Sequence, residues 1–107
     1  MDRFGIEAVS ALHTYPFADE GQFLTNSGPM MAAVDEFHIT VQGVGGHGAY
    51  PSICKDPMPC ALAIGQALQT IVSRNTDPLL PLVVSLTMIS GGTATNVIPE
   101  TVNLSGT

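Results

Sequence analysis

The chain has 107 residues, enough for one small domain and too few for two complete ones. Hydrophobic residues make up 45% of it and charged residues 11%, a composition that can build a core and excludes an intrinsically disordered chain. The net charge is −6, from 9 acidic and 3 basic side chains. This balance excludes nucleic acids and anionic membrane surfaces as partners, because both need clustered Lys and Arg.

So few charges leave less polar surface than a solitary monomer carries, which indicates an interface with a partner chain or with a further domain. No apolar run reaches the roughly 20 residues that span a bilayer. The N-terminal sequence MDRFGIEAVSAL lacks the basic start and the long apolar centre of a secretory signal. Cys54 and Cys60 lie close together, with no second pair elsewhere. We therefore expect reduced thiols in a cytoplasmic protein.

The first third of the chain combines one short apolar run with many turn residues. Residues 7–12 (EAVSAL) are expected to form a buried strand whose carboxyl end presents His13 at a surface crevice. Residues 17–33 are rich in Gly, Asn, Ser and Pro. They predict a linker with one short strand around residues 22–25.

A strand and a helix are predicted next. In residues 35–44 (DEFHITVQGV) the apolar Phe37, Ile39 and Val41 alternate with polar residues, the period of a half-buried strand. The glycine-rich residues 43–49 predict a flexible turn that presents His47. A helix is expected over residues 57–74, because Asp56-Pro57 suits a helix start and apolar residues then recur at helical spacing. These apolar residues are Ala61, Ile64, Leu68, Ile71 and Val72.

Two further strands complete the predicted fold. Residues 82–89 are expected to form one strand with an apolar face, and residues 101–107 the other, with a turn or loop at residues 91–96. The residues of the apolar face are Leu82, Val84, Leu86 and Met88. The order from residue 35 onward, strand-helix-strand-strand, predicts an α+β fold. In it one helix packs on one face of an open, largely antiparallel sheet.

Several segments in series resemble one family. They are GGHGAYPSICKDP, LQTIVSR, GGTATNVIP and LSGT, and SALHTYP and SGPMMAAVDEF fit as well. The family is the dinuclear-metal amidohydrolase and exopeptidase group (metallopeptidase family twenty), which contains aminoacylases, hippurate hydrolases and auxin-conjugate hydrolases.

The resemblance implies how the chain is divided. Residues 1–34 would be the tail of a catalytic-domain segment. Residues 35–107 would be the first part of a lid and dimerisation domain, an incomplete ferredoxin-like unit. We expect a fragment, since natural boundaries rarely fall inside a strand. We expect it to be inactive alone, because the Cys-x-His, Glu-Glu and late His of the family are missing from this sequence.

For the parent enzyme, the resemblance implies a homodimer through the lid sheet and two divalent metal ions, Zn²⁺ or Mn²⁺. The substrate would be an N-acyl amino acid. His13 matches a metal ligand of this family. One His does not hold a metal ion, because such a site needs three or four ligands. We therefore expect no metal bound by this chain alone.

Two more residues match the family's shared active site. His47 matches a lid His that reaches the partner subunit's site and stabilises the developing oxyanion; without the motif it would be an ordinary exposed loop His. Asn96 matches a lid Asn that hydrogen-bonds substrate; without the motif it would be a turn residue tolerating positive φ. Other polar residues lack any such context: His38, Asp35, Glu36, Glu100, Ser10 and Ser85.

The alternative to an enzyme fragment is a non-catalytic dimerisation or binding module. An exposed strand edge favours this alternative, because edges pair with copies of themselves. A partner would then supply the strand that the half-domain lacks, by exchange between chains.

Overall fold

The computed structural model describes residues 2–107, which divide into two compact units, residues 2–32 and residues 33–107. Residues 2–32 contain one 3-10 helix, η1 (Asp2–Phe4), and no strand. The strands expected at residues 7–12 and 22–25 are therefore wrong. A strand needs a neighbour that bonds its backbone N–H and C=O groups, and no residue of the described chain pairs with either segment.

The helix of the second unit, α1 (Pro57–Asn75), confirms the prediction and is one residue longer than expected. Its start follows from two residues. The Asp56 carboxylate accepts a hydrogen bond from the Met58 N–H at 2.9 Å, and Pro57 occupies the first turn, where no N–H is needed. Nothing helical in residues 2–107 combines the length and the apolar character that crossing a bilayer requires.

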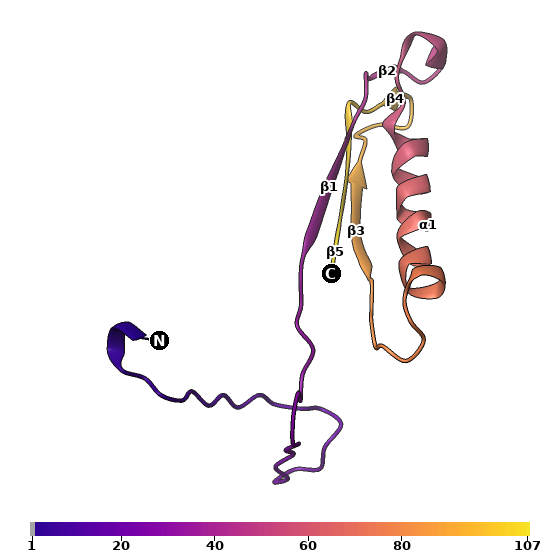
Figure 1. Ribbon diagram of the computed structural model, residues 1–107. Coiled ribbons are helices and arrows are strands. Elements are labelled where there is room, and N and C mark those ends of the chain that lie inside the picture. Colours follow the sequence, from indigo (N-terminus) through magenta and orange to yellow (C-terminus); the bar gives the residue numbers. More distant parts are fainter. Residues whose placement is uncertain (1) are drawn as a thin grey trace. The chain divides into compact units, whose positions relative to one another are not determined.

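Three strands form the main sheet, β1 (Phe37–Gln42), β3 (Leu86–Gly91) and β5 (Thr101–Gly106). Their order is β1-β5-β3 and both pairings are antiparallel, so the last strand in sequence is the central one. Figure 1 shows α1 running along one face of this sheet. The α+β prediction, one helix on an open antiparallel sheet, is confirmed.

The core lies between α1 and β5. Val102 and Leu104 of β5 and Ala61 of α1 are fully buried, and apolar residues of the neighbouring elements pack around them. A Cβ on Gly65 would lie 3.0 Å from the Leu86 side chain, so the missing side chain lets the helix approach the sheet. Burying a Leu or Val side chain contributes about 1.5–3 kcal/mol, which makes these few residues the main source of stability.

The strand β3 departs from its prediction. It covers Leu86–Gly91 instead of residues 82–89, and its pairing with β5 shifts between Leu86 and Met88. The extra residue, Thr87, reverses the alternation beyond it. Ile89 therefore lies opposite Leu104 on the helix-facing side, while Met88 lies opposite Ser105. Of the apolar face expected for Leu82, Val84, Leu86 and Met88, Leu86 does pack against the core, Leu82 and Val84 precede the strand, and the register shift takes Met88 to the other face.

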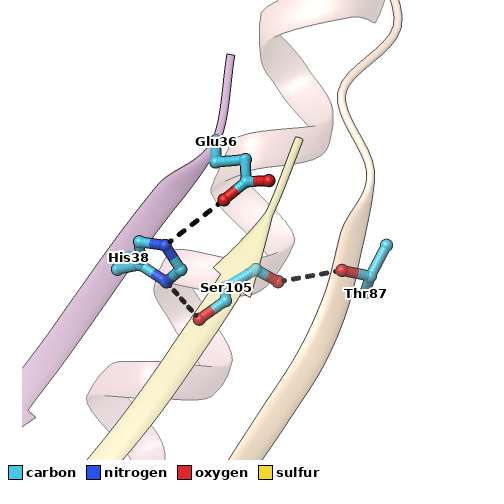
Figure 2. Close-up of polar contacts among 4 residues, drawn as sticks. All are labelled: Glu36, His38, Thr87 and Ser105. Atoms are coloured by element: carbon cyan, nitrogen blue, oxygen red, sulfur yellow. Dashed lines mark hydrogen bonds and ion pairs between the residues drawn. The ribbon is translucent and has the colours of Figure 1, made fainter. Parts of the chain in front are cut away.

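The face of the sheet opposite α1 is polar. His38 and Ser105 are partners in the β1–β5 register, and the His38 Nδ1 lies 3.0 Å from the Ser105 Oγ (Figure 2). The Glu36 carboxylate lies 3.8 Å from the His38 Nε2, and the Thr87 hydroxyl donates to the Ser105 carbonyl at 3.4 Å. His38 and Glu36 are 73% and 74% exposed, so these contacts are screened by water and stabilise the sheet little.

Candidate functional site

The glycine-rich segment after β1 forms a second, two-stranded sheet. β2 (Gly46–His47) pairs antiparallel with β4 (Val97–Ile98), so that Gly46 lies opposite Ile98 and His47 opposite Val97. Neither short strand was predicted, because two residues carry no readable alternation. The pairing brings together two sequence segments that α1 and β3 separate.

The glycines of this segment allow a close approach of neighbouring backbone and side chains, which the sequence did not predict. A Cβ on Gly45 would lie 2.7 Å from the Ile98 carbonyl oxygen, and one on Gly46 would lie 2.5 Å from the Cys54 sulfur. A Cβ on Gly43 would collide with the Lys55 carbonyl. The segment is therefore closely packed against the neighbouring backbone, and the flexible turn expected for residues 43–49 is a fixed structure.

His47 is the last residue of β2 and is exposed. Its carbonyl accepts from the Tyr50 N–H at 2.9 Å, which closes a turn, and its Nδ1 accepts from the Ala49 N–H at 3.1 Å. The Tyr50 ring lies beside the imidazole, with centroids 5.8 Å apart. The ring of His47 is thus held by its own turn. Its other nitrogen belongs to an exposed side chain and has no hydrogen-bond partner among residues 2–107.

Asn96 lies directly next to this turn. Its carbonyl accepts from the Gly48 N–H at 2.7 Å, and it immediately precedes β4. The side chain of Asn96 is exposed. The φ of Asn96 is not positive. The alternative interpretation, a turn residue chosen because it tolerates positive φ, therefore does not apply. An amide that is fixed by its backbone and exposed offers both a donor and an acceptor to a ligand.

The loop before Asn96 borders an open depression. Residues 91–95 and 97–99 line it together with Asp56 and Met58 from the start of α1. Neither His47 nor Asn96 is among the lining residues. The two predicted site residues therefore lie on an exposed surface outside this depression. A ligand bound by them would need contacts from a second protein surface.

His13 lies in the other unit and is exposed. Its Nδ1 lies 2.6 Å from the Thr14 carbonyl oxygen, which suits an imidazole that donates from Nδ1 and keeps Nε2 free as a ligand atom. Within residues 2–107 no group of three His, Cys, Asp or Glu side chains is close enough to hold a metal ion. The described donors therefore do not form a metal centre by themselves, and His13 could supply one ligand of a larger set.

Cys54 and Cys60 are both free, and only Cys54 is partly buried, with its sulfur 3.5 Å from the Tyr50 carbonyl. Sequence reasoning overlooked Cys54, Tyr50 and the Ala49 amide, which support the His47 turn. The one available signal was the His-Gly-Ala-Tyr sequence itself, since glycine is common in tight turns.

Comparison with known proteins supports a common origin for most of this chain. Residues 33–107 match the family model described as peptidase dimerisation domain. The N-acetyl-L-cysteine deacetylase of Bacillus subtilis is 45% identical over 103 residues, covering 96% of this chain and 25% of that protein. The hippurate hydrolase of Campylobacter jejuni is 41% identical over 100 residues, covering 94% of this chain and 26% of that protein.

A solved structure agrees in fold. A putative aminohydrolase from methicillin-resistant Staphylococcus aureus superimposes with a TM-score of 0.63 and 37% identity, covering 66% of this chain and 19% of that chain. The chain thus spans about a quarter of the length of the curated relatives that it matches.

Proposed function

This chain belongs to the M20 peptidase family through its dimerisation domain, and on that premise we propose that it supplies the lid of a hydrolase acting on N-acyl amino acids. The observation that carries the proposal is the β2–β4 pairing. It places His47 and the residue after Asn96 opposite each other in one small sheet. The parent would be a longer protein, since the relatives extend well beyond the matched segment.

In this proposal His47 is the catalytic residue of the lid. Its outward nitrogen would donate a hydrogen bond to the carbonyl oxygen of the scissile amide. That bond would strengthen as negative charge develops on the oxygen in the transition state. A donor held by its own turn loses little freedom when substrate arrives, which is the condition for such stabilisation. The exposure of His47 fits a site completed by another polypeptide surface.

Asn96 would bind the substrate beside His47. The Gly48 N–H donates to the Asn96 carbonyl at 2.7 Å, so the backbone next to His47 is joined to that of Asn96. A displacement of His47 would therefore also displace Asn96. The amide of Asn96 would pair with the carboxylate or the acyl oxygen of an N-acyl amino acid.

Metal chemistry would need residues outside this chain. We propose His13 as one ligand of a Zn²⁺ or Mn²⁺ centre, because the contact between its Nδ1 and the Thr14 carbonyl leaves Nε2 available for a metal. The remaining ligands would come from other parts of the parent protein. The two ions would supply Lewis-acid activation there.

A dimerisation domain implies a homodimer, and we propose that the sheet of this domain forms the contact. Both β1 and β3 are edge strands. Beside β3, the side chains of Leu62, Leu86 and Ile89 line an open groove against α1, and Leu62 is 58% exposed. Apolar surface next to an unpaired edge is what a second copy would cover.

The dimer proposal is tested by light scattering after size-exclusion chromatography of the 107-residue chain. Leu62→Lys should convert a dimer into a monomer, because it places a charge in the groove. Leu79→Lys is the matched control, since Leu79 is 89% exposed outside the groove, and it should leave the dimer intact. A wild-type chain that stays monomeric at high concentration would contradict the proposal.

The catalytic proposal is tested in a chimera. The matched segment of the Bacillus subtilis relative is replaced by the residues of this chain, and hydrolysis of N-acetyl-cysteine is measured. His47→Ala should lower kcat by about 100- to 1,000-fold, the usual effect of losing an oxyanion donor. His38→Ala is the control and should leave kcat unchanged, because His38 lies on the other sheet. Equal rates for the two variants would refute the role of His47.

The alternative function is a non-catalytic dimerisation or binding module, and the two exposed sheet edges favour it. The two functions differ in what they predict for the chimera. Neither predicts hydrolysis of N-acyl amino acids by this chain with added Mn²⁺ or Zn²⁺. Only the enzyme lid predicts an active chimera.

A further inference from the structure

The turn after β2 constrains the chemical form of His47. The Nδ1 of His47 accepts a hydrogen bond from the Ala49 N–H at 3.1 Å. A backbone N–H only donates, so Nδ1 must present its lone pair and carries no hydrogen. In the neutral imidazole the single ring hydrogen is then on Nε2. The hydrogen-bond network thus assigns the tautomer of this ring.

The other histidines have different surroundings. The Nδ1 of His13 lies 2.6 Å from the Thr14 carbonyl oxygen, which only accepts, so the hydrogen of His13 is on Nδ1. The Nδ1 of His38 lies 3.0 Å from the Ser105 hydroxyl, which both donates and accepts, so either tautomer of His38 satisfies the contact. The chain therefore contains one histidine with its hydrogen on Nε2, one with its hydrogen on Nδ1, and one whose contacts allow either tautomer.

The Ala49 N–H is held in place by the turn that carries it. The Tyr50 N–H donates to the His47 carbonyl at 2.9 Å, and the Gly48 N–H donates to the Asn96 carbonyl at 2.7 Å. Both flanking amides are thus engaged, and rotation of the Ala49 peptide away from the imidazole would disturb one or the other. The contact is built into the β2–β4 unit.

We propose that the backbone amide of Ala49 is a positioning group that fixes His47 as an Nε2–H donor. The outward atom of His47 is then complementary to an acceptor oxygen, a carbonyl or a carboxylate, and not to a hydroxyl or ammonium donor. This consequence for the substrate rests on the proposed function. The tautomer itself does not, because it follows from contacts within the described chain.

The test is nitrogen NMR of the 107-residue chain with ¹⁵N-labelled backbone and histidine, at alkaline pH. His47 should show a protonated Nε2, an unprotonated Nδ1 and a scalar coupling across the hydrogen bond to the Ala49 amide nitrogen. His13 should show the opposite tautomer, with hydrogen on Nδ1. A protonated Nδ1 in His47, or no coupling to Ala49, would overturn the proposal.

Two variants separate the amide from the side chain of Ala49. Ala49→Gly keeps the N–H and should keep the coupling and the tautomer of His47. Ala49→Pro removes the N–H and should abolish the coupling and shift His47 to the tautomer mixture of free imidazole. If the spectrum of Ala49→Pro shows that the β2–β4 pairing is lost, this variant is set aside. The presence or absence of the coupling in the wild-type chain then decides the proposal. If His47→Ala leaves kcat of the chimera unchanged, the proposed function is refuted, but the assignment of the His47 tautomer still holds.

Discussion

Residues 2–32 and residues 33–107 differ in what their apolar side chains accomplish. The first unit contains large apolar side chains that are mostly in water, among them Phe23 at 82% and Phe17 at 85% exposed. The second unit buries Val102 and Leu104 completely between a sheet and a helix. Both units contain apolar residues, but only the second has a sheet and a helix that cover them.

The difference shows that an apolar run becomes a structural element only with a second layer. Residues 7–12 are as apolar as many strands, yet no strand of the described chain pairs with them. Residues 37–42 become β1 because each of them has a partner in β5. In this chain the second unit alone should unfold cooperatively, and matched substitutions in the two units test that expectation.

The largest effect is expected from removing a core side chain. Leu104→Ala should destabilise the second unit by about 2–5 kcal/mol, because it leaves a cavity between β5 and α1. That is a large part of a small domain's stability. Phe23→Ala is the matched change in the first unit and should leave urea unfolding of the helix, followed by circular dichroism, unchanged. Equal destabilisation by the two changes would show that the units form one cooperative core.

A smaller loss is expected from filling the close contact at Gly106. A Cβ there would collide with the Ser85 carbonyl and lie 2.7 Å from the Phe37 ring, so Gly106→Ala should cost about 1–3 kcal/mol. Gly28→Ala is its counterpart in the first unit, where φ is +96° and nothing lies within 4 Å of the new Cβ. Its local strain should not alter the melting temperature of α1. A melting shift for Gly28→Ala would contradict the independence of the two units.

The helix cap comes next. Asp56→Ala removes the acceptor of the Met58 N–H and should destabilise the second unit by about 1 kcal/mol. Asp19→Ala, in the first unit, removes a long 3.4 Å contact with the exposed Gln22 side chain and should have no measurable effect. Thermal unfolding of the two variants, measured in the same buffer, gives the comparison.

The smallest effect is expected on the open face of the sheet. The Thr40 hydroxyl donates to the Asn103 side chain at 2.8 Å, but both residues are exposed. Thr40→Val should therefore change stability by no more than about 0.5 kcal/mol. A loss above 1 kcal/mol would mean that this face is covered in solution, and light scattering of the variant would show whether a second copy covers it.

The elements with strong local signals were predictable. α1 was predicted from the Asp56-Pro57 start and the helical spacing of its apolar residues, and β1 and β5 from their alternation. β3 was only half predicted, because nothing in the sequence reveals the register shift next to Thr87. The unpaired segment at residues 7–12 shows the opposite error, since a favourable composition does not supply a neighbouring strand.

The sequence proposes the residues of the candidate site one by one but does not predict their arrangement. His47 and Asn96 were identified from motifs, while their proximity depends on β2 and β4, which are too short for any periodic signal. The role of the Ala49 amide was beyond sequence reasoning altogether, since every residue except proline has an N–H and only geometry shows where it points.

The central place of β5 has a consequence for how the molecule forms. β1 and β3 do not contact each other directly; each bonds only to β5, which follows both in the sequence. During synthesis neither strand finds its partner until the last part of this unit has been made, and Phe37 must wait for Gly106. Pairings between such distant residues form slowly. Between its own synthesis and that of β5, β1 is therefore an unpaired strand while α1 and β3 are made, and this is the interval in which chaperones are expected to matter most.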